Sequence, residues 1–184
     1  MTQMSRRATI LALGALPLAA CGNGIGGDRG AKIDARVDAT LSELFSKYPD
    51  TLNLRDNASA MLVMPLVTEA GLGFGGAYGR GALRIGTTTV DYYSAVKASV
   101  GPQIGAQQYA SVLFFMTQEA LAEFRSSSGW AAGADVEYAI PSAGKTLSTE
   151  TTTALSPVIA FVFGNAGLRL GATLEGVKYS RILP

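Results

Sequence analysis

The sequence contains few of the residue types that carry out catalysis. It has no histidine and a single cysteine, Cys21. This excludes Ser-His-Asp hydrolysis, Cys-His chemistry and metal sites built from imidazole or several thiolates. The 14 acidic residues are scattered without a closely spaced pair, although carboxylates from distant parts of a chain can still meet. We therefore expect no enzyme, no metal and no cofactor. A hydrolase that uses Ser or Thr with Lys or a carboxylate is the alternative.

Cys21 is placed for a different reaction. It follows Leu18, Ala19 and Ala20, and Gly22 comes after it. This order resembles the bacterial lipobox, in which a peptidase cuts before a cysteine whose thiol carries a diacylglyceryl group. An exported chain with one cysteine also has no partner for an intramolecular disulfide. The sequence therefore predicts lipidation at Cys21 and membrane lipid as a partner, with the acyl anchor holding the domain permanently.

The segment before the cysteine has the features of an export signal. Two adjacent arginines precede an uncharged stretch, residues 8–20. At about 1.5 Å per helical residue this stretch reaches about 20 Å, which is too short for a hydrocarbon core of roughly 30 Å. We interpret residues 1–20 as a signal peptide, with the general and the twin-arginine routes both open. Either route predicts a membrane surface facing the periplasm. By resemblance to enterobacterial lipoprotein sorting, in which an Asp after the cysteine favours retention in the inner membrane, Gly22 favours the outer membrane over the inner.

The chain after the signal divides into a short tether and one domain. Gly occupies five of the nine positions 22–30, so residues 21–30 are expected to be a lipidated, flexible tether. Residues 31–184 are long enough for a single domain. Removing residues 1–20 takes away two of the 15 basic residues and none of the 14 acidic ones, which leaves a formal charge of −1. This balance predicts no attraction to nucleic acid.

The first element of the domain is expected to be an amphipathic helix over residues 31–48, which Pro49 ends. Its apolar stripe consists of Ile33, Val37, Leu41, Leu44, Phe45 and Tyr48. Three cations, Lys32, Arg36 and Lys47, lie off this stripe and alternate with acidic residues. They form either an ordinary solvated face or a basic edge that contacts lipid headgroups.

Glycines recur, mostly at every second position, between residues 71 and 81. Gly71, Gly73 and Gly76 formally satisfy the G-x-G-x-x-G pattern of dinucleotide sites, but that site needs a helix to begin there. The alternation of glycine with Leu72 and Phe74 indicates strands instead. A sheet face without side chains permits sharp bending or the close approach of another backbone.

The remaining pattern predicts further strands and a short helix. Strands are expected over residues 87–93, 99–107, 109–116 and 158–163, the last with an antiparallel hairpin partner at residues 168–174. Thr117 is the expected N-cap of a helix that ends before Gly129. Because no helix of crossover length separates the later strands, the fold class is α+β. It comprises an amphipathic N-terminal helix and short helices packed on a bent, mostly antiparallel, glycine-rich sheet or partial barrel.

Taken together, these stretches resemble the SYLF domain family. The resemblance extends from about Leu41 to the end of the chain. It rests on Pro49, Ala58, Val63, Pro65, Ala70-Gly71-Leu72, Gly75-Gly76, Tyr78-Gly79-Arg80-Gly81, Ser99-Val100-Gly101, Gln103-Ile104-Gly105-Ala106-Gln107, Phe124, Gly167-Leu168, Gly171 and Leu174-Glu175-Gly176. It implies a non-catalytic lipid-binding domain. Eukaryotic relatives bind phosphoinositides through an amphipathic N-terminal segment, some bind actin filaments, and bacterial relatives are often lipoproteins.

The sequence departs from the family's pattern at three places. Tyr93-Ser94 replaces a Trp-Ser turn, Glu69 replaces a basic residue, and residues 140–144 replace a Gly-Pro-x-Gly stretch. The candidate headgroup contacts are the cations Lys32, Arg36, Lys47, Arg80, Arg84 and Lys97. The alternative is an envelope scaffold that binds a protein partner and uses its lipid only as a tether.

Overall fold

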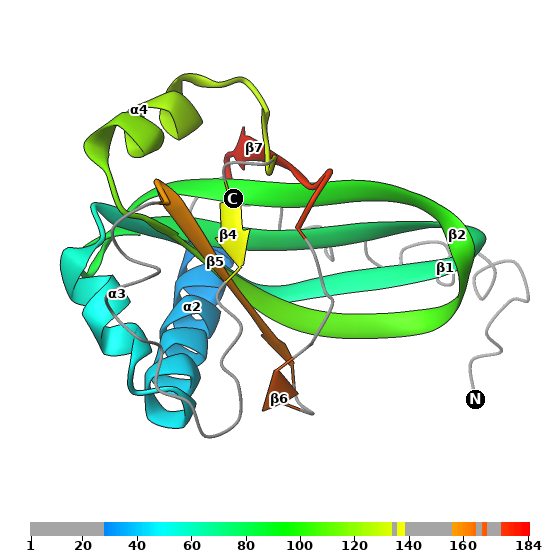
Figure 1. Ribbon diagram of the computed structural model, residues 1–184, viewed down its shortest axis with the longest axis horizontal. Helices are drawn as coiled ribbons and strands as arrows, with labels where there is room; N and C mark the ends of the chain where they lie inside the picture. Colours follow the sequence, from blue (N-terminus) through cyan, green and yellow to red (C-terminus); the bar gives the residue numbers. More distant parts are fainter. Residues whose placement is uncertain (1–27, 134–135, 139–155, 165–166, 169–173) are drawn as a thin grey trace, which may run out of the picture.

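The computed structural model describes residues 28–133, 136–138, 156–164, 167–168 and 174–184. The predicted signal peptide, Cys21 and residues 169–173 of the predicted closing hairpin lie outside this part of the chain. The described residues form helices packed on a curled, largely antiparallel sheet (Figure 1). This confirms the predicted α+β class.

Helix α2, Asp28–Lys47, is the predicted amphipathic helix, but it begins three residues earlier than expected. The last residues of the predicted tether are therefore helical. Asp28 lies in the first turn, where a negative charge favours the helix dipole. Gly30 lets this turn pack closely, since a Cβ atom there would lie 2.9 Å from the Tyr92 hydroxyl.

Two shorter helices follow. Helix α3, Thr51–Asn57, was not predicted, and its buried Thr51 donates a hydrogen bond of 2.6 Å to the carbonyl oxygen of Tyr48. Helix α4, Gln118–Ser126, ends before Gly129 as expected. The Thr117 side chain accepts a hydrogen bond of 3.2 Å from the Ala120 amide, which confirms the predicted N-cap.

The centre of the fold is one very long β-hairpin. The short strands expected on either side of residue 86 are two continuous strands, β1 (Ala60–Ile85) and β2 (Thr88–Phe115). They pair from Ala60 opposite Phe115 to Ile85 opposite Thr88, with three register shifts along the way. Gly86 turns the chain with a φ of 58°, a conformation that favours glycine.

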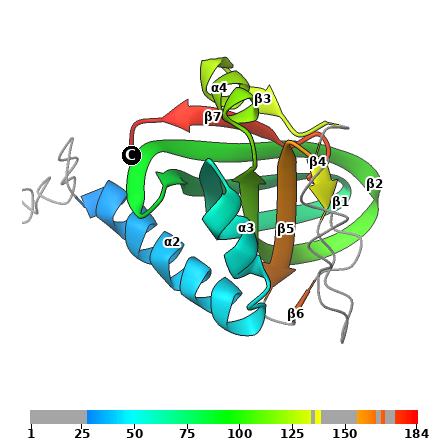
Figure 2. The same ribbon diagram turned by 60° about the vertical axis from the view of Figure 1, so that its left-hand side comes forward.

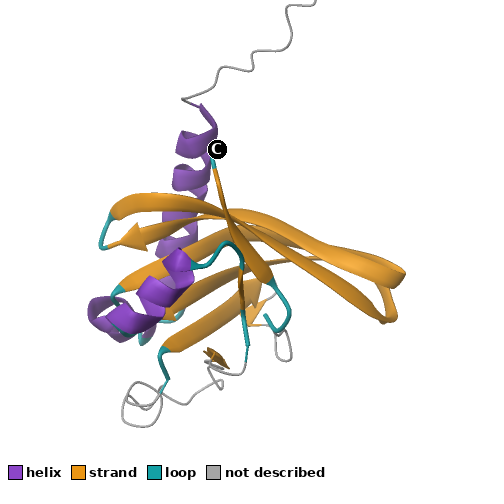
Figure 3. Cartoon of the chain, turned by 90° about the horizontal axis from the view of Figure 1, so that it is seen from above, coloured by secondary structure: helices purple, strands orange, loops and turns teal. Residues whose placement is uncertain are grey.

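This hairpin bends back on itself, so that the two halves of β1 lie against each other (Figures 1 and 3). The contact depends on glycine. A side chain at Gly81 would overlap the carbonyl group of Val63, and a Cβ atom at Gly79 would lie 2.9 Å from the carbonyl oxygen of Leu66. The predicted close approach of another backbone is therefore correct, and the other backbone belongs to the same strand.

Short strands extend the hairpin on both sides into a seven-stranded sheet. Strand β7 (Lys178–Ile182) pairs with the first half of β2, and β3 (Trp130–Ala131) pairs with β7. On the other side, β5 (Val158–Gly164) pairs with the second half of β2. Strand β6 (Gly167–Leu168) pairs with β5 and begins the predicted closing hairpin. Strand β4 (Val136–Tyr138) pairs with β5 in parallel.

The curled sheet has a hydrophobic cluster on each face. The inner cluster is closed by α4 and is rich in aromatic side chains: Tyr93, Phe115, Phe124, Trp130 and Tyr179. The outer cluster lies beneath α2 and α3, where Val37 and Leu44 pack with Val63 and Phe161 (Figure 2). Helix α2 is therefore fixed on the outer face, across the place where the two halves of β1 meet.

Candidate functional site

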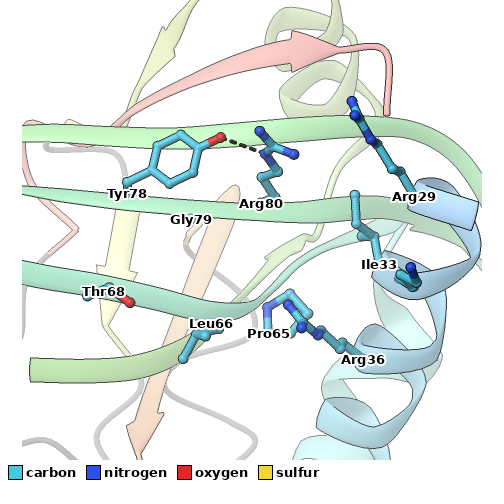
Figure 4. Close-up of a pocket in the computed structure, with 10 residues that line it drawn as sticks. Arg29, Ile33, Arg36, Pro65, Leu66, Thr68, Tyr78, Gly79 and Arg80 are labelled. Atoms are coloured by element: carbon cyan, nitrogen blue, oxygen red, sulfur yellow. Dashed lines mark hydrogen bonds between the residues drawn. The ribbon is translucent and has the colours of Figure 1, made fainter. Parts of the chain in front are cut away.

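A groove of about 310 Å³ lies where α2 passes over the bent hairpin (Figure 4). Four cations line it: Arg29, Lys32 and Arg36 from α2, and Arg80 from β1. The other lining residues are Ile33, Pro65, Leu66, Thr68, Tyr78 and Gly79. We call this site the basic groove. Its three segments come from α2 and from both halves of β1, so only the bend of the hairpin brings them together.

Helical periodicity places three of the cations side by side. Arg29, Lys32 and Arg36 are separated by three and four residues and so share one face of α2. The buried Val37 marks the adjacent face, which packs on the sheet. Asp34 lies beyond the buried face, about 140° around the helix axis from Arg29 at 100° per residue. The helix thus has a basic edge and an acidic edge, with the buried stripe between them.

The acidic edge of α2 is bound to the turn end of the hairpin. Asp34 accepts hydrogen bonds from the Thr89 hydroxyl at 2.7 Å and from the Tyr92 hydroxyl at 2.8 Å. Burial raises the pKa of Tyr92, and its hydrogen bond to Asp34 raises that pKa further. Asp38 accepts a hydrogen bond of 2.7 Å from the guanidinium of Arg84. These bonds fix the rotation of α2 and direct its basic edge to the opposite flank, where the groove lies.

On the strand side, Arg80 is positioned by Tyr78. The Nε of Arg80 donates a hydrogen bond of 2.6 Å to the Tyr78 hydroxyl, and the guanidinium carbon lies 5.7 Å from the centre of the Tyr78 ring. The two residues are two positions apart on β1 and therefore share a face of the strand. Such a cation–π contact restrains the guanidinium while it stays exposed.

The groove carries a concentrated positive charge. No carboxylate belongs to its lining, and within the described residues none lies within 4.0 Å of the charged nitrogens of Lys32, Arg36 or Arg80. Ile33 and Leu66 supply apolar walls. Guanidinium groups bind phosphate or carboxylate oxygens through two parallel hydrogen bonds. The geometry therefore suits an anionic ligand, phosphate above all.

Three of the six cations predicted from the sequence, Lys32, Arg36 and Arg80, lie in the basic groove. Arg29 is a fourth that we did not predict, because residues 21–30 were assigned to the tether. Its spacing of three and seven residues from Lys32 and Arg36 is the signal that could have identified it.

The other three predicted cations do not line the groove. Lys47, at the far end of α2, forms an ion pair of 2.6 Å with Glu43, and this hydrogen bond raises the pKa of Lys47. The buried Arg84 donates to the Thr87 carbonyl oxygen at 2.6 Å as well as to Asp38. Lys97 lies on β2 opposite Ala77.

The described residues contain no group of three or more His, Cys, Asp or Glu side chains arranged to hold a metal ion. Among the helices of this described part, none combines the length and the hydropathy needed to cross a bilayer.

One comparison identifies a family. Residues 96–181 match the Ysc84 family model, which is described as "Las17-binding protein actin regulator". The matched segment includes the second half of β2, α4, β5 and most of β7. No curated protein matches the chain. The match confirms the resemblance seen in the sequence, and residues 96–181 are similar to the Ysc84, or SYLF domain, family.

Proposed function

We propose that this protein is a non-catalytic, membrane-anchored lipoprotein whose basic groove binds the phosphate of an anionic lipid headgroup. The observation that supports this function is the convergence of four cations from α2 and β1 on one groove whose lining contains no carboxylate. Three of the four are arginines, which match the geometry of phosphate oxygens better than lysine does.

The groove and the proposed acyl anchor would act together. A basic residue near an anionic membrane surface contributes about 1 kcal/mol, so a groove of this kind binds reversibly when it acts alone. An anchor at Cys21 raises the local concentration of headgroups and makes the second contact intramolecular. Asp28, the first residue of α2, lies seven positions after Cys21, and seven extended residue steps can span at most about 25 Å. The anchored groove would therefore stay within reach of the bilayer surface.

The proposed location is the periplasmic face of a membrane, with the outer membrane favoured. It rests on the lipobox-like residues Leu18 to Cys21 and on Gly22. Mass spectrometry of the protein purified from native membranes tests it directly. We expect an N-terminus at Cys21 that carries acyl chains. An intact Met1 together with a free thiol would refute the lipoprotein assignment.

Vesicle co-sedimentation tests headgroup binding. The full chain with Cys21→Ser carries no acyl group, and every variant shares the same N-terminus. Vesicles of neutral phosphatidylcholine measure any binding that does not depend on headgroup charge. Adding about a third of phosphatidylglycerol then reports the charge-dependent part, which is the quantity to compare.

Two double variants of equal charge separate the groove from general electrostatics. Lys32→Gln with Arg36→Gln removes two groove cations. Lys47→Gln with Arg55→Gln removes one exposed lysine and one exposed arginine outside the groove. Two contacts of about 1 kcal/mol each correspond to a loss of about 30-fold, which we expect for the groove variant only. Equal losses in both variants, or no preference of the parent for anionic vesicles, would contradict the proposal.

The same variants also distinguish lipid binding from the alternative function, an envelope scaffold that binds a protein partner. In that case, crosslinking in intact cells would capture one partner through the groove, while the vesicle preference would be absent.

A further inference from the structure

Beyond the basic groove, the outer face of the hairpin is uncovered and apolar. Helix α2 covers this face at Ala82, which is fully buried. Further along the strands the same face is open to solvent, and the ribbon extends past the helix (Figure 3). Four large apolar side chains are exposed there: Phe74 at 79%, Tyr78 at 49%, Val96 at 48% and Leu66 at 41%. We call these four residues the apolar strip.

Strand register shows that three of the four residues of the apolar strip, Phe74, Tyr78 and Val96, lie on the same face of the sheet. Tyr78 and Val96 are direct partners in the antiparallel ladder, and paired residues share a face. Phe74 lies four positions from Tyr78, so it lies on that face too, about 13 Å further along the strand. Between them the face carries Gly76 and its partner Ala98, and neither has a charge.

The strip is continuous with the basic groove. Leu66 and Tyr78 belong to both, and Arg80 follows Tyr78 on the same face of β1. Charge and apolar surface are therefore ordered along the hairpin: the four cations lie on α2 and the adjoining part of β1, and the exposed rings and aliphatic groups lie beyond them. Scattered exposed apolar residues are normal on protein surfaces, but a contiguous set beside a cationic site indicates an interface.

The ordering matches the two zones of an anionic bilayer surface. Cations meet the phosphate layer, and aromatic and aliphatic side chains enter the boundary between headgroups and acyl chains. We propose that the apolar strip inserts into this boundary while the basic groove holds headgroup phosphate, so that the bent hairpin docks on the membrane along its outer face. This inference rests on the proposed function and adds the surface and orientation of binding. The charge complementarity of the adjoining groove favours an anionic bilayer over a protein as the occupant.

An environment-sensitive probe tests the insertion. Phe74→Cys in the Cys21→Ser chain provides a single thiol for a nitrobenzoxadiazole label. Asn57→Cys provides the matched control, because residue 57 is exposed on α3, which lies away from the bend of the hairpin (Figure 1). With phosphatidylglycerol-containing vesicles, we expect a blue shift and brighter fluorescence at position 74. Position 57 should keep the spectrum that it has in buffer.

Substitutions on one strand test the contribution to affinity. Val96→Ser removes an apolar group of the strip, whereas Val90→Ser removes an equivalent exposed group of β2 outside it. We expect Val96→Ser and Phe74→Ser each to weaken binding to anionic vesicles about five-fold or more. Val90→Ser should bind like the parent.

The outcomes separate this inference from the proposed function. If the parent binds anionic vesicles and the fluorescence of the label at position 74 does not change, the groove binds headgroups and the insertion is refuted. A parent that does not bind anionic vesicles refutes both. A dimer in solution that Phe74→Ser dissociates would identify a second copy of the chain as the occupant and overturn the membrane assignment.

Discussion

Arg84 on β1 donates a hydrogen bond of 2.7 Å to Asp38 on α2, 46 positions earlier in the chain. One guanidinium of a buried arginine thus joins the turn end of the hairpin to the acidic edge of the helix. Asp34, one turn before Asp38, receives two more hydrogen bonds from β2. This network determines which edge of α2 meets the sheet, and so it positions Arg29, Lys32 and Arg36 over the groove.

The network predicts unequal roles for its two carboxylates. Asp34→Ala removes the acceptor of both Thr89 and Tyr92, and we expect it to lower the free energy of unfolding by about 1–3 kcal/mol. The Asp38 side chain is 65% exposed, so Asp38→Ala should cost less than about 1 kcal/mol. Urea unfolding of both variants measures the difference. Equal losses would show that the two acids contribute alike.

The contact between the two halves of β1 predicts a strict requirement for glycine. Gly81→Ala places a methyl group against the Val63 carbonyl group, where backbone must move to make room. We expect a loss of about 3 kcal/mol or more, or failure to fold. Gly133→Ala is the control, since a Cβ atom there meets nothing within 4 Å. It should change stability by less than about 0.5 kcal/mol. A stable Gly81→Ala protein would contradict the observed bend.

The helix that closes the inner cluster depends on its N-cap. Thr117→Ala leaves the Ala120 amide without its acceptor, and we expect a loss of about 0.5–2 kcal/mol. Thr117→Ser keeps the hydroxyl oxygen and should retain most of the stability. Thermal unfolding followed by Trp130 fluorescence measures the stability of this region, because the centres of the Trp130 ring and of the Phe124 ring on α4 lie 5.5 Å apart. Equal effects of the two substitutions would argue against capping.

Tyr92 predicts a change in stability at alkaline pH. Burial and the hydrogen bond to Asp34 raise its pKa above 10.0 in the folded protein. As the pH rises, Tyr92 ionises first in the unfolded chain, which favours unfolding. Its contribution to stability is therefore complete below pH 10 and is lost as the pH passes through the folded pKa. The stability difference between the parent and Tyr92→Phe should shrink over this range in urea unfolding. A constant difference would exclude a raised pKa.

Local patterns in the sequence predicted helices α2 and α4 and the class of the fold. The apolar spacing of α2 and the Thr117 cap act within a few residues, so they are readable from the chain alone. Helix α3 was missed because seven residues with only Thr51 and Leu54 buried carry too short a pattern. The short strand β7 was missed for a similar reason, since pairing with β2 rather than its own sequence defines it.

The candidate site could be predicted only in part, because a tertiary contact assembles it. The sequence identified Lys32, Arg36 and Arg80 as cations, but their convergence depends on the bend that Gly79 and Gly81 permit. Arg84 looked equivalent to Arg80 in the sequence. Its burial and its bond to Asp38 depend on where α2 packs, which local patterns do not determine.

The central claim is that phosphate binds in the basic groove, and side-chain NMR of arginine tests it most directly. In a titration of the full Cys21→Ser chain with glycerol 3-phosphate, the Nε resonances of Arg29, Arg36 and Arg80 should shift together and saturate. Those of Arg55 and Arg125, outside the groove, should stay in place. Equal shifts at all five arginines, or none at the three groove residues, would contradict the claim.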